Sequence, residues 1–241
     1  MNPGIYLLHK PIGPTSFSVV KAFKAGGAEG VEIGQIAELG VIVPRNAGAG
    51  PPEIARPQVR PDASAASGLK ICHGGTLDPF ASGLLLMLVE PATRLFDYLH
   101  DIPKTYEATV RWGIETDNGD PFGKVISSGD CSELSERRLD EALSGFVGWS
   151  EQTPHATSAR RIDGERAYLK AHRGESVAMP MARVYLHEAR WLGHDLSGQD
   201  LSGRYLSGVD RPVQSRLRIT VRGGFYVRAL ARDLSSFFCC W

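Results

Sequence analysis

Apolar and polar positions alternate over several stretches of the chain, and each such stretch predicts a β-strand. The clearest begins at Arg216, where Leu217, Ile219 and Val221 fall on one face, and arginines and a threonine fall on the other. We therefore expect this strand to turn one face to a core and to present a basic face to solvent. Further strands are predicted at residues 4–10, 84–89, 105–112 and 181–191.

Helical spacing of apolar residues is found between these strands. Helices are predicted at residues 16–24, with Thr15 and Ser16 as N-cap candidates, and at residues 92–100. Another is predicted to begin after the N-cap candidate Ser135, and a further one covers residues 165–173 and ends before Gly174. A last helix follows the turn at Gly223 and Gly224, with Arg228 and Arg232 on one side and, on its apolar side, Val227, Leu230, Leu234 and Phe237. Because strands and helices interleave irregularly, we predict an α+β fold with a mixed, largely antiparallel sheet flanked by helices.

Two segments are predicted to be loops. Residues 26–68 are rich in Gly, Ala and Pro, without a helical or strand period after Val43, which indicates a flexible insertion or a long surface loop. Residues 195–208 repeat at period five (DLSGQDLSGRYLSG), but three copies are too few to bury a core by stacking. We therefore expect an irregular hairpin loop there.

Composition and charge exclude several classes of protein. The 241 residues include 27 Lys and Arg, 27 Asp and Glu and 42% hydrophobic residues, as in an ordinary globular chain. No apolar run is long enough to span a membrane, and the first residues lack the pattern of a signal peptide, so we expect a cytoplasmic protein with no membrane partner. Four cysteines without metal-ligand spacing imply neither structural zinc nor disulfides.

The most informative candidate for chemistry is the segment KICHGGTLDPFASG at residues 70–83. It surrounds one carboxylate, Asp78, with glycines that allow a close approach of the backbone to a ligand, and Pro79 stiffens the chain after it. The alternative is that Asp78 only organises a turn, because Asp-Pro is common in turns. The local sequence does not decide between a catalytic and a turn-forming role of Asp78.

Two further segments suit a nucleotide ligand. In RGGFYVR at residues 222–228, an aromatic ring beside cations can stack on a base and pair with phosphate; the alternative is an edge strand whose arginines serve solubility. In KTYE at residues 104–107, Tyr106 can equally be an ordinary core tyrosine. Signatures of nucleotide, dinucleotide and zinc sites do not occur, so we expect no cofactor and no metal.

Taken together, these segments resemble the bacterial tRNA pseudouridine synthase B family. The most specific element is H-x-G-x-L-D-P-x-A-x-G, which His73 begins and Gly83 ends. The other matching blocks follow in the family's order, at residues 4–11, 14–21, 104–108, 112–123, 158–174 and 221–234. The resemblance implies the pseudouridine synthase catalytic fold and the conversion of uridine 55 in the T loop of tRNA to pseudouridine.

The resemblance also implies roles for individual residues. Asp78 matches the essential catalytic aspartate. Five matches are expected to bind the substrate or support the site: Tyr106 against the target base, Arg228 paired with the aspartate, Tyr226 as the aromatic before it, His73 at the flipped nucleotides and Lys10 in the N-terminal K-P motif. The family further implies base flipping, tRNA as the partner through its T arm, and action as a monomer.

The residue types fit this chemistry. Isomerisation breaks the N-glycosidic bond and reattaches uracil through C5, and a carboxylate near the anomeric carbon can act as nucleophile or as base. An arginine partner favours the ionised carboxylate. The reaction is redox-neutral, and the base must leave the folded RNA to enter a pocket.

The chain departs from the family pattern at several places. Residues 154–161 lack an aromatic of the family motif, and the insertion at residues 26–68 precedes the catalytic loop. The chain also stops at SSFFCCW, where family members continue into an RNA-binding domain. We therefore expect a single catalytic domain over residues 1–241, without that C-terminal domain and with reduced stability and RNA affinity.

Two other functions remain as alternatives. A non-catalytic tRNA-binding or folding module is favoured by the early end of the chain, and it would bind tRNA without forming pseudouridine. A glycoside-cleaving enzyme would need a second carboxylate near Asp78, which the matching blocks do not offer. The zero net charge does not exclude RNA, because acids gather at residues 115–151 and arginines at residues 204–232.

Overall fold

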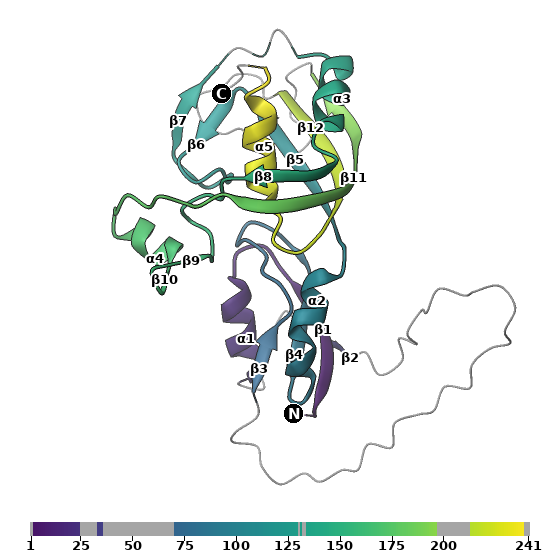
Figure 1. Ribbon diagram of the computed structural model, residues 1–241, viewed down its shortest axis with the longest axis vertical. Coiled ribbons are helices and arrows are strands. Elements are labelled where there is room, and N and C mark those ends of the chain that lie inside the picture. Colours follow the sequence, from purple (N-terminus) through teal and green to yellow (C-terminus); the bar gives the residue numbers. More distant parts are fainter. Residues whose placement is uncertain are drawn as a thin grey trace, which may run out of the picture. The chain divides into compact units, whose positions relative to one another are not determined.

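A computed structural model describes residues 2–24, 33–35, 70–129, 131, 134–196 and 213–238 (Figure 1). The chain divides into two compact units, Met1–His100 and Asp101–Trp241. The predicted insertion at residues 26–68 and the predicted hairpin loop at 195–208 lie mostly outside the described residues. A single catalytic domain over the whole chain stays a prediction.

The first unit is a four-stranded sheet with the order β2-β1-β4-β3. Its strands are β1 (Gly4–Lys10), β2 (Ile33–Gln35), β3 (Ile71–His73) and β4 (Gly83–Val89). Helix α1 (Ser16–Lys24) packs on it, because its apolar residues Val19, Val20 and Phe23 form one cluster with Tyr6 and Leu8 of β1. A 3-10 turn, η1 (Ala92–Leu95), and helix α2 (Phe96–Asp101) follow β4.

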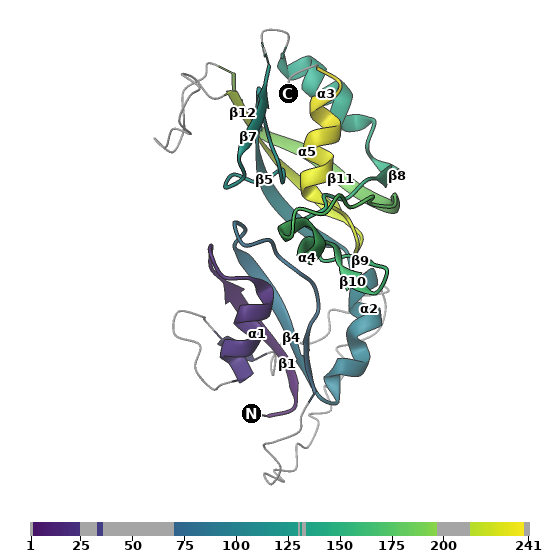
Figure 2. The same ribbon diagram turned by 90° about the vertical axis from the view of Figure 1, so that its left-hand side faces the viewer.

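The second unit is built on a sheet with the order β5-β12-β11-β8. Its strands are β5 (Lys104–Trp112), β8 (Gly148–Gln152), β11 (Ala182–Asp195) and β12 (Val213–Val221). Helices α3 (Glu136–Ser144) and α5 (Val227–Ser235) lie on one face of this sheet (Figure 2). The predicted alternation of β12 is confirmed, since Leu217, Ile219 and Val221 are buried in the core beneath these helices.

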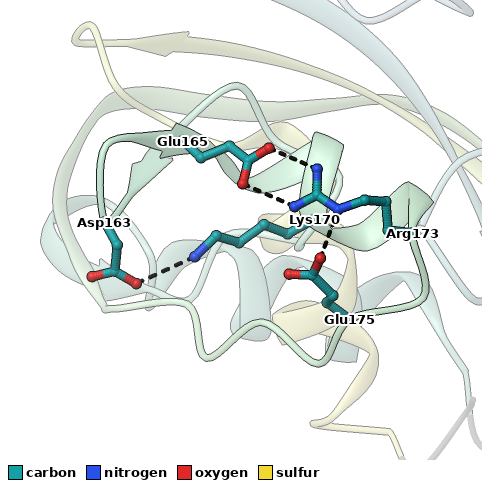
Figure 3. A network of polar contacts seen from close by, with 5 residues as sticks. All are labelled: Asp163, Glu165, Lys170, Arg173 and Glu175. Atoms are coloured by element: carbon teal, nitrogen blue, oxygen red, sulfur yellow. Dashed lines mark hydrogen bonds and ion pairs between the residues drawn. The ribbon is translucent and has the colours of Figure 1, made fainter.

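Two small hairpins complete the second unit: β6 (Ile114–Thr116) with β7 (Val125–Ser128), and β9 (Arg161–Ile162) with β10 (Glu165–Arg166). Helix α4 (Ala167–His172) follows β10, and Gly174, with a φ of 75°, lies just after the end of this helix. The prediction that this helix begins at Glu165 is wrong, because Glu165 and Arg166 pair with β9. Ion pairs join the hairpin to α4 and to the residues after it: Arg173 pairs with Glu165 and Glu175, and Lys170 pairs with Asp163 (Figure 3).

The predicted apolar side of α5 needs one correction. Leu230 and Leu234 are fully buried, but the helix ends at Ser235 and Phe237 is 60% exposed. Phe238 takes the core position instead, with its ring 5.8 Å from that of Trp112. The chain leaves the helical path before Phe237, so the helical period no longer determines which residue faces the core.

The predicted α+β class is confirmed. All strand pairings among the described residues are antiparallel, so the mixed sheet that the pattern left open is not observed in that part of the chain. The predicted strands match to within a few residues at their ends. None of the described helices combines the length and the apolar character that crossing a bilayer requires.

Candidate active site

In the first unit, Asp78 lies on the loop at residues 74–82 that joins β3 to β4. The backbone shapes this loop: Gly74 N donates to Leu86 O at 2.8 Å, and Ala81 N donates to Asp78 O at 3.0 Å. A Cβ on Gly74 would lie 3.1 Å from the Leu86 Cβ, which explains the glycine at this close approach. The loop thus presents a half-buried carboxylate from a well-defined turn.

Lys10 is buried and fastens this loop from the end of β1. Its Nζ donates to the carbonyl oxygens of Ala81 at 2.6 Å, Pro11 at 3.0 Å and Pro79 at 3.3 Å. Burial lowers the pKa of Lys10, and the negative charge of Asp78 partly offsets this shift. The ammonium group therefore orders the backbone on the C-terminal side of Asp78 and places a positive charge near its carboxylate.

Ser16 holds the other side of the loop, a role that our sequence analysis missed. Its hydroxyl donates to Leu77 O at 3.0 Å and accepts from Leu77 N at 2.9 Å. Thr15, the other N-cap candidate, accepts from Ser18 N at 3.0 Å and caps α1. The signal in the sequence was a second polar residue directly after the cap Thr15, at a position where another cap is not needed.

His73 is the third predicted site residue in this unit. It ends β3, and its Nδ1 lies 2.5 Å from Gly75 O, which orients the ring. Lys10, His73 and Asp78 thus all belong to the sheet β1-β4-β3 and the loop that it carries. The other predicted site residues, Tyr106, Tyr226 and Arg228, belong to the second unit.

Tyr106 lies on β5, opposite Ile219 of β12, and packs on the core of the second unit. Burial raises the pKa of its hydroxyl, so the phenol stays neutral at physiological pH. Tyr226 precedes α5, and its backbone N–H donates to Oε1 of the buried Gln152 at 2.9 Å. Gln152 thereby fixes the start of α5.

Arg228 is the second residue of α5, and its Nη1 has two acceptors in the second unit. It donates to Asn118 O at 2.6 Å and to Thr157 Oγ1 at 2.8 Å. Asn118 belongs to the turn between β6 and β7, and Thr157 to the segment that follows β8. Sequence reasoning did not single out either acceptor, because they lie 110 and 71 positions from Arg228.

His155 lies beside these groups with a neutral ring. Burial, then the positive charges of Arg228 and Arg232, lower its pKa to about 4. A Cβ on Gly119 would come within 2.7 Å of Cε1 and Nε2 of this ring, so only glycine fits there. Gly119 also has a φ of 68°, a conformation that glycine adopts readily.

The lowered pKa of His155 predicts a loss of stability in mild acid. Its pKa is about 4 in the folded chain and 6.5 ordinarily, so between these values the unfolded chain binds the proton and the folded chain does not. The free energy of unfolding is therefore expected to fall by about 1 kcal/mol from pH 7 to pH 5 on account of this residue, after allowance for its partial exposure. Urea unfolding of the wild type and of His155→Gln at both pH values measures it, and equal pH dependences would contradict the assignment.

The predicted basic face of β12 is only partly basic. Arg218 forms an ion pair with Glu107 of β5, and Arg216 Nη2 lies 3.6 Å from the same carboxylate. The hydrogen bond and charge of Arg218, with a smaller effect of Arg216, lower the pKa of Glu107. Glu107 therefore offsets part of the positive charge on this face.

The described residues hold no group of three or more His, Cys, Asp or Glu side chains arranged to bind a metal ion. The first unit offers a carboxylate on a fixed loop with a buried ammonium group near it, and the second unit separately offers an arginine held at the start of a helix. A carboxylate in such a setting is suited to nucleophilic or general-base catalysis.

Comparison with known proteins assigns the chain to a family. Residues 64–227 match the TruB family pseudouridylate synthase (N terminal domain). The tRNA pseudouridine synthase B of Acaryochloris marina is 37% identical over 171 residues, which are 69% of this chain and 53% of that protein. The enzyme of the same name from Mycobacteroides abscessus is 37% identical over 164 residues, covering 68% and 51%. The chain belongs to the TruB family of pseudouridylate synthases, and it spans about half the length of these relatives.

A solved structure supports the fold. A chain of an H/ACA RNP bound to a substrate RNA containing 2'-deoxyuridine superposes with a TM-score of 0.51 at 19% sequence identity, covering 98% of this chain and 43% of that one. At this identity the likeness concerns the fold alone. The family predicted from the sequence blocks is confirmed by the match over residues 64–227.

Proposed function

We propose that the chain isomerises uridine 55 in the T loop of tRNA to pseudouridine. The observation that carries the proposal is the family match over residues 64–227, supported by relatives at 37% identity that are named tRNA pseudouridine synthase B. That segment contains His73, Asp78, Tyr106 and Tyr226; Arg228 directly follows it, and Lys10 lies well before it. The substrate is a folded RNA, so the target base leaves its stack before it reacts.

In this proposal Asp78 is the catalytic residue. Its carboxylate assists cleavage of the bond between N1 of uracil and C1' of the ribose, the base turns, and a C5–C1' bond replaces the lost one. The C5 proton leaves and N1 gains a proton, so the reaction is balanced without an oxidant or a reductant. Substrate-binding roles are proposed for Lys10, His73, Tyr106, Tyr226 and Arg228.

The fixed loop supports this role for Asp78. Nucleophilic and general-base catalysis require a group held within a fraction of an ångström of the reacting atom. Lys10 and Ser16 fasten the loop on both sides of Asp78 through five hydrogen bonds to its neighbours and to Pro11. We further propose that the protein acts in the cytoplasm, as a monomer, on the T arm.

The test is tritium release from an unmodified tRNA transcript labelled at C5 of its uridines. Release should follow the formation of one pseudouridine per tRNA, at position 55 by chemical mapping. A transcript with cytidine at position 55 is the matched control, and it should release nothing. If the chain binds tRNA with steep salt dependence but releases no tritium, the proposed reaction is wrong and a non-catalytic binding role replaces it.

A further inference from the structure

The start of α5 is held by residues that come from two separate turns of the second unit. Gln152, His155 and Thr157 lie close together in sequence, at the end of β8 and just after it. Gln152 accepts from the backbone of Tyr226, Thr157 accepts from the side chain of Arg228, and His155 lies near the charge of Arg228. Asn118, from the turn between β6 and β7, supplies another acceptor for Arg228. Asn118 and Thr157 thus both bind the Arg228 side chain, which a helix end does not need for its own backbone.

The two acceptors of Nη1 determine the plane of the guanidinium group. Nη1 carries two hydrogens, and Asn118 O at 2.6 Å and Thr157 Oγ1 at 2.8 Å can accept both. The other three N–H groups of the planar guanidinium then have fixed directions. Without the Thr157 hydroxyl, Nη1 keeps the Asn118 carbonyl but loses the second acceptor, so the direction of the group is less firmly fixed.

The acceptor on the other side is itself rigid. Asn118 Oδ1 accepts from Asp120 N at 3.0 Å, and Thr116 Oγ1 donates to Asp120 O at 3.0 Å. These bonds close the β6–β7 turn and fix the direction of the Asn118 carbonyl. The turn is therefore a stable support for Arg228.

His155 joins the two supports. Its ring lies so close to Gly119, the residue after Asn118, that a Cβ there would come within 2.7 Å of Cε1 and Nε2. It also lies close enough to Arg228 and Arg232 for their charges to lower its pKa. The charged groups around this ring are Arg228, Arg232 and Asp120. A neutral imidazole fills this place without repelling the two arginines, whereas a charged one would push against both.

We propose that Thr157 and His155 are positioning residues for Arg228: they fix the direction in which its guanidinium group addresses the substrate. The inference rests on the proposed function, in which Arg228 binds the substrate. It deepens that function, because it assigns the rate of the reaction partly to two residues outside the predicted site. Neither residue is expected to touch the reacting atoms.

Thr157→Val tests the inference, since valine keeps the shape of threonine and removes only the hydroxyl. We expect the single-turnover rate on tRNA to fall about tenfold or more, the size of effect that loss of one hydrogen bond to a charged group produces. The Kd for tRNA should change less than about threefold, because an interaction that matters only for alignment lowers the rate and not the affinity. Thr157→Ser restores the hydroxyl and should restore the rate.

Thr153→Val is the matched control, since Thr153 is exposed and lies in the same segment. It should leave both rate and affinity unchanged. His155→Phe, which keeps a ring but removes its nitrogens, should also lower the rate. The double variant with Thr157→Val should lose less than the product of the two single losses, because both residues act through Arg228.

A second readout does not depend on catalysis. In NMR spectra of arginine-labelled protein, rotation of the Arg228 guanidinium group should be faster in Thr157→Val than in the wild type and in Thr153→Val. Unchanged rotation, or a wild-type turnover rate in Thr157→Val, would overturn the inference. If the wild type forms no pseudouridine at all, the proposed function fails, and the rotation measurement still decides whether Thr157 positions Arg228. Should Thr157→Val not fold, Thr157→Ala is measured in the same way.

Discussion

Replacement of Asp78 by asparagine is expected to abolish pseudouridine formation. The amide has nearly the same size as the carboxylate and keeps one oxygen, but it cannot act as a nucleophile or accept a proton at neutral pH. Loss of the group that does the chemistry typically costs several orders of magnitude, so we expect a fall of at least about 1000-fold in the single-turnover rate. Tritium release from C5-labelled tRNA measures it.

The control for this variant is Asp97→Asn, on the exposed side of α2 in the same unit. It should react at the wild-type rate. Asp78→Asn should still fold and bind tRNA, because the loop around it is fastened by Lys10 and Ser16 through backbone groups rather than through its carboxylate. Asp78→Asn that retained a tenth of the wild-type rate would remove Asp78 from the chemistry.

Local sequence patterns predicted most of the elements because each depends on near neighbours. The alternation in β12 and the helical spacing in α5 describe which face of one element is apolar, and the cores of both units follow these faces. The N-cap at Ser135 was predicted correctly as well, since its side chain accepts from Arg138 N. Such signals act over three or four residues.

The helix predicted to begin at Glu165 was wrong for a reason that the sequence itself contains. Asp163 and Gly164 have φ values of 51° and 83°, the positive values that a two-residue hairpin turn requires. The Asp-Gly pair in RIDGER was a hairpin signal, and it makes Glu165 and Arg166 a strand rather than the start of a helix. Turn chemistry here prevails over the helical spacing that follows.

Sequence patterns could not predict the hydrogen-bond partners that hold Lys10 and Arg228 in place. Lys10 meets Pro79 and Ala81 across 69 and 71 positions, and Arg228 meets Asn118 across 110. No periodicity links residues at such separations. The resemblance to a family identified Lys10 and Arg228 as site residues, but it did not say which backbone groups hold them.

Lys10→Met is expected to lower both stability and activity. Methionine fills similar space, but the carbonyl oxygens of Pro79, Ala81 and Pro11 lose their shared donor. A buried acceptor left without a partner costs about 1–3 kcal/mol, and relief from burying a charge offsets part of the loss from three acceptors. We expect the free energy of unfolding to fall by about 2 kcal/mol and the Tm by about 4–8 °C, measured by thermal unfolding.

The loss of activity in Lys10→Met should exceed what the lower stability explains. At a temperature where the variant is still fully folded, the loop on the C-terminal side of Asp78 has lost its anchor, so the carboxylate spends less time in the reactive position. We expect the single-turnover rate there to fall by about 100-fold or more, while Lys24→Met, an exposed lysine on α1, leaves rate and Tm unchanged. A Lys10→Met protein with reduced Tm but a wild-type rate would mean that Ser16 alone positions the loop, since Ser16 still binds both backbone groups of Leu77 next to Asp78.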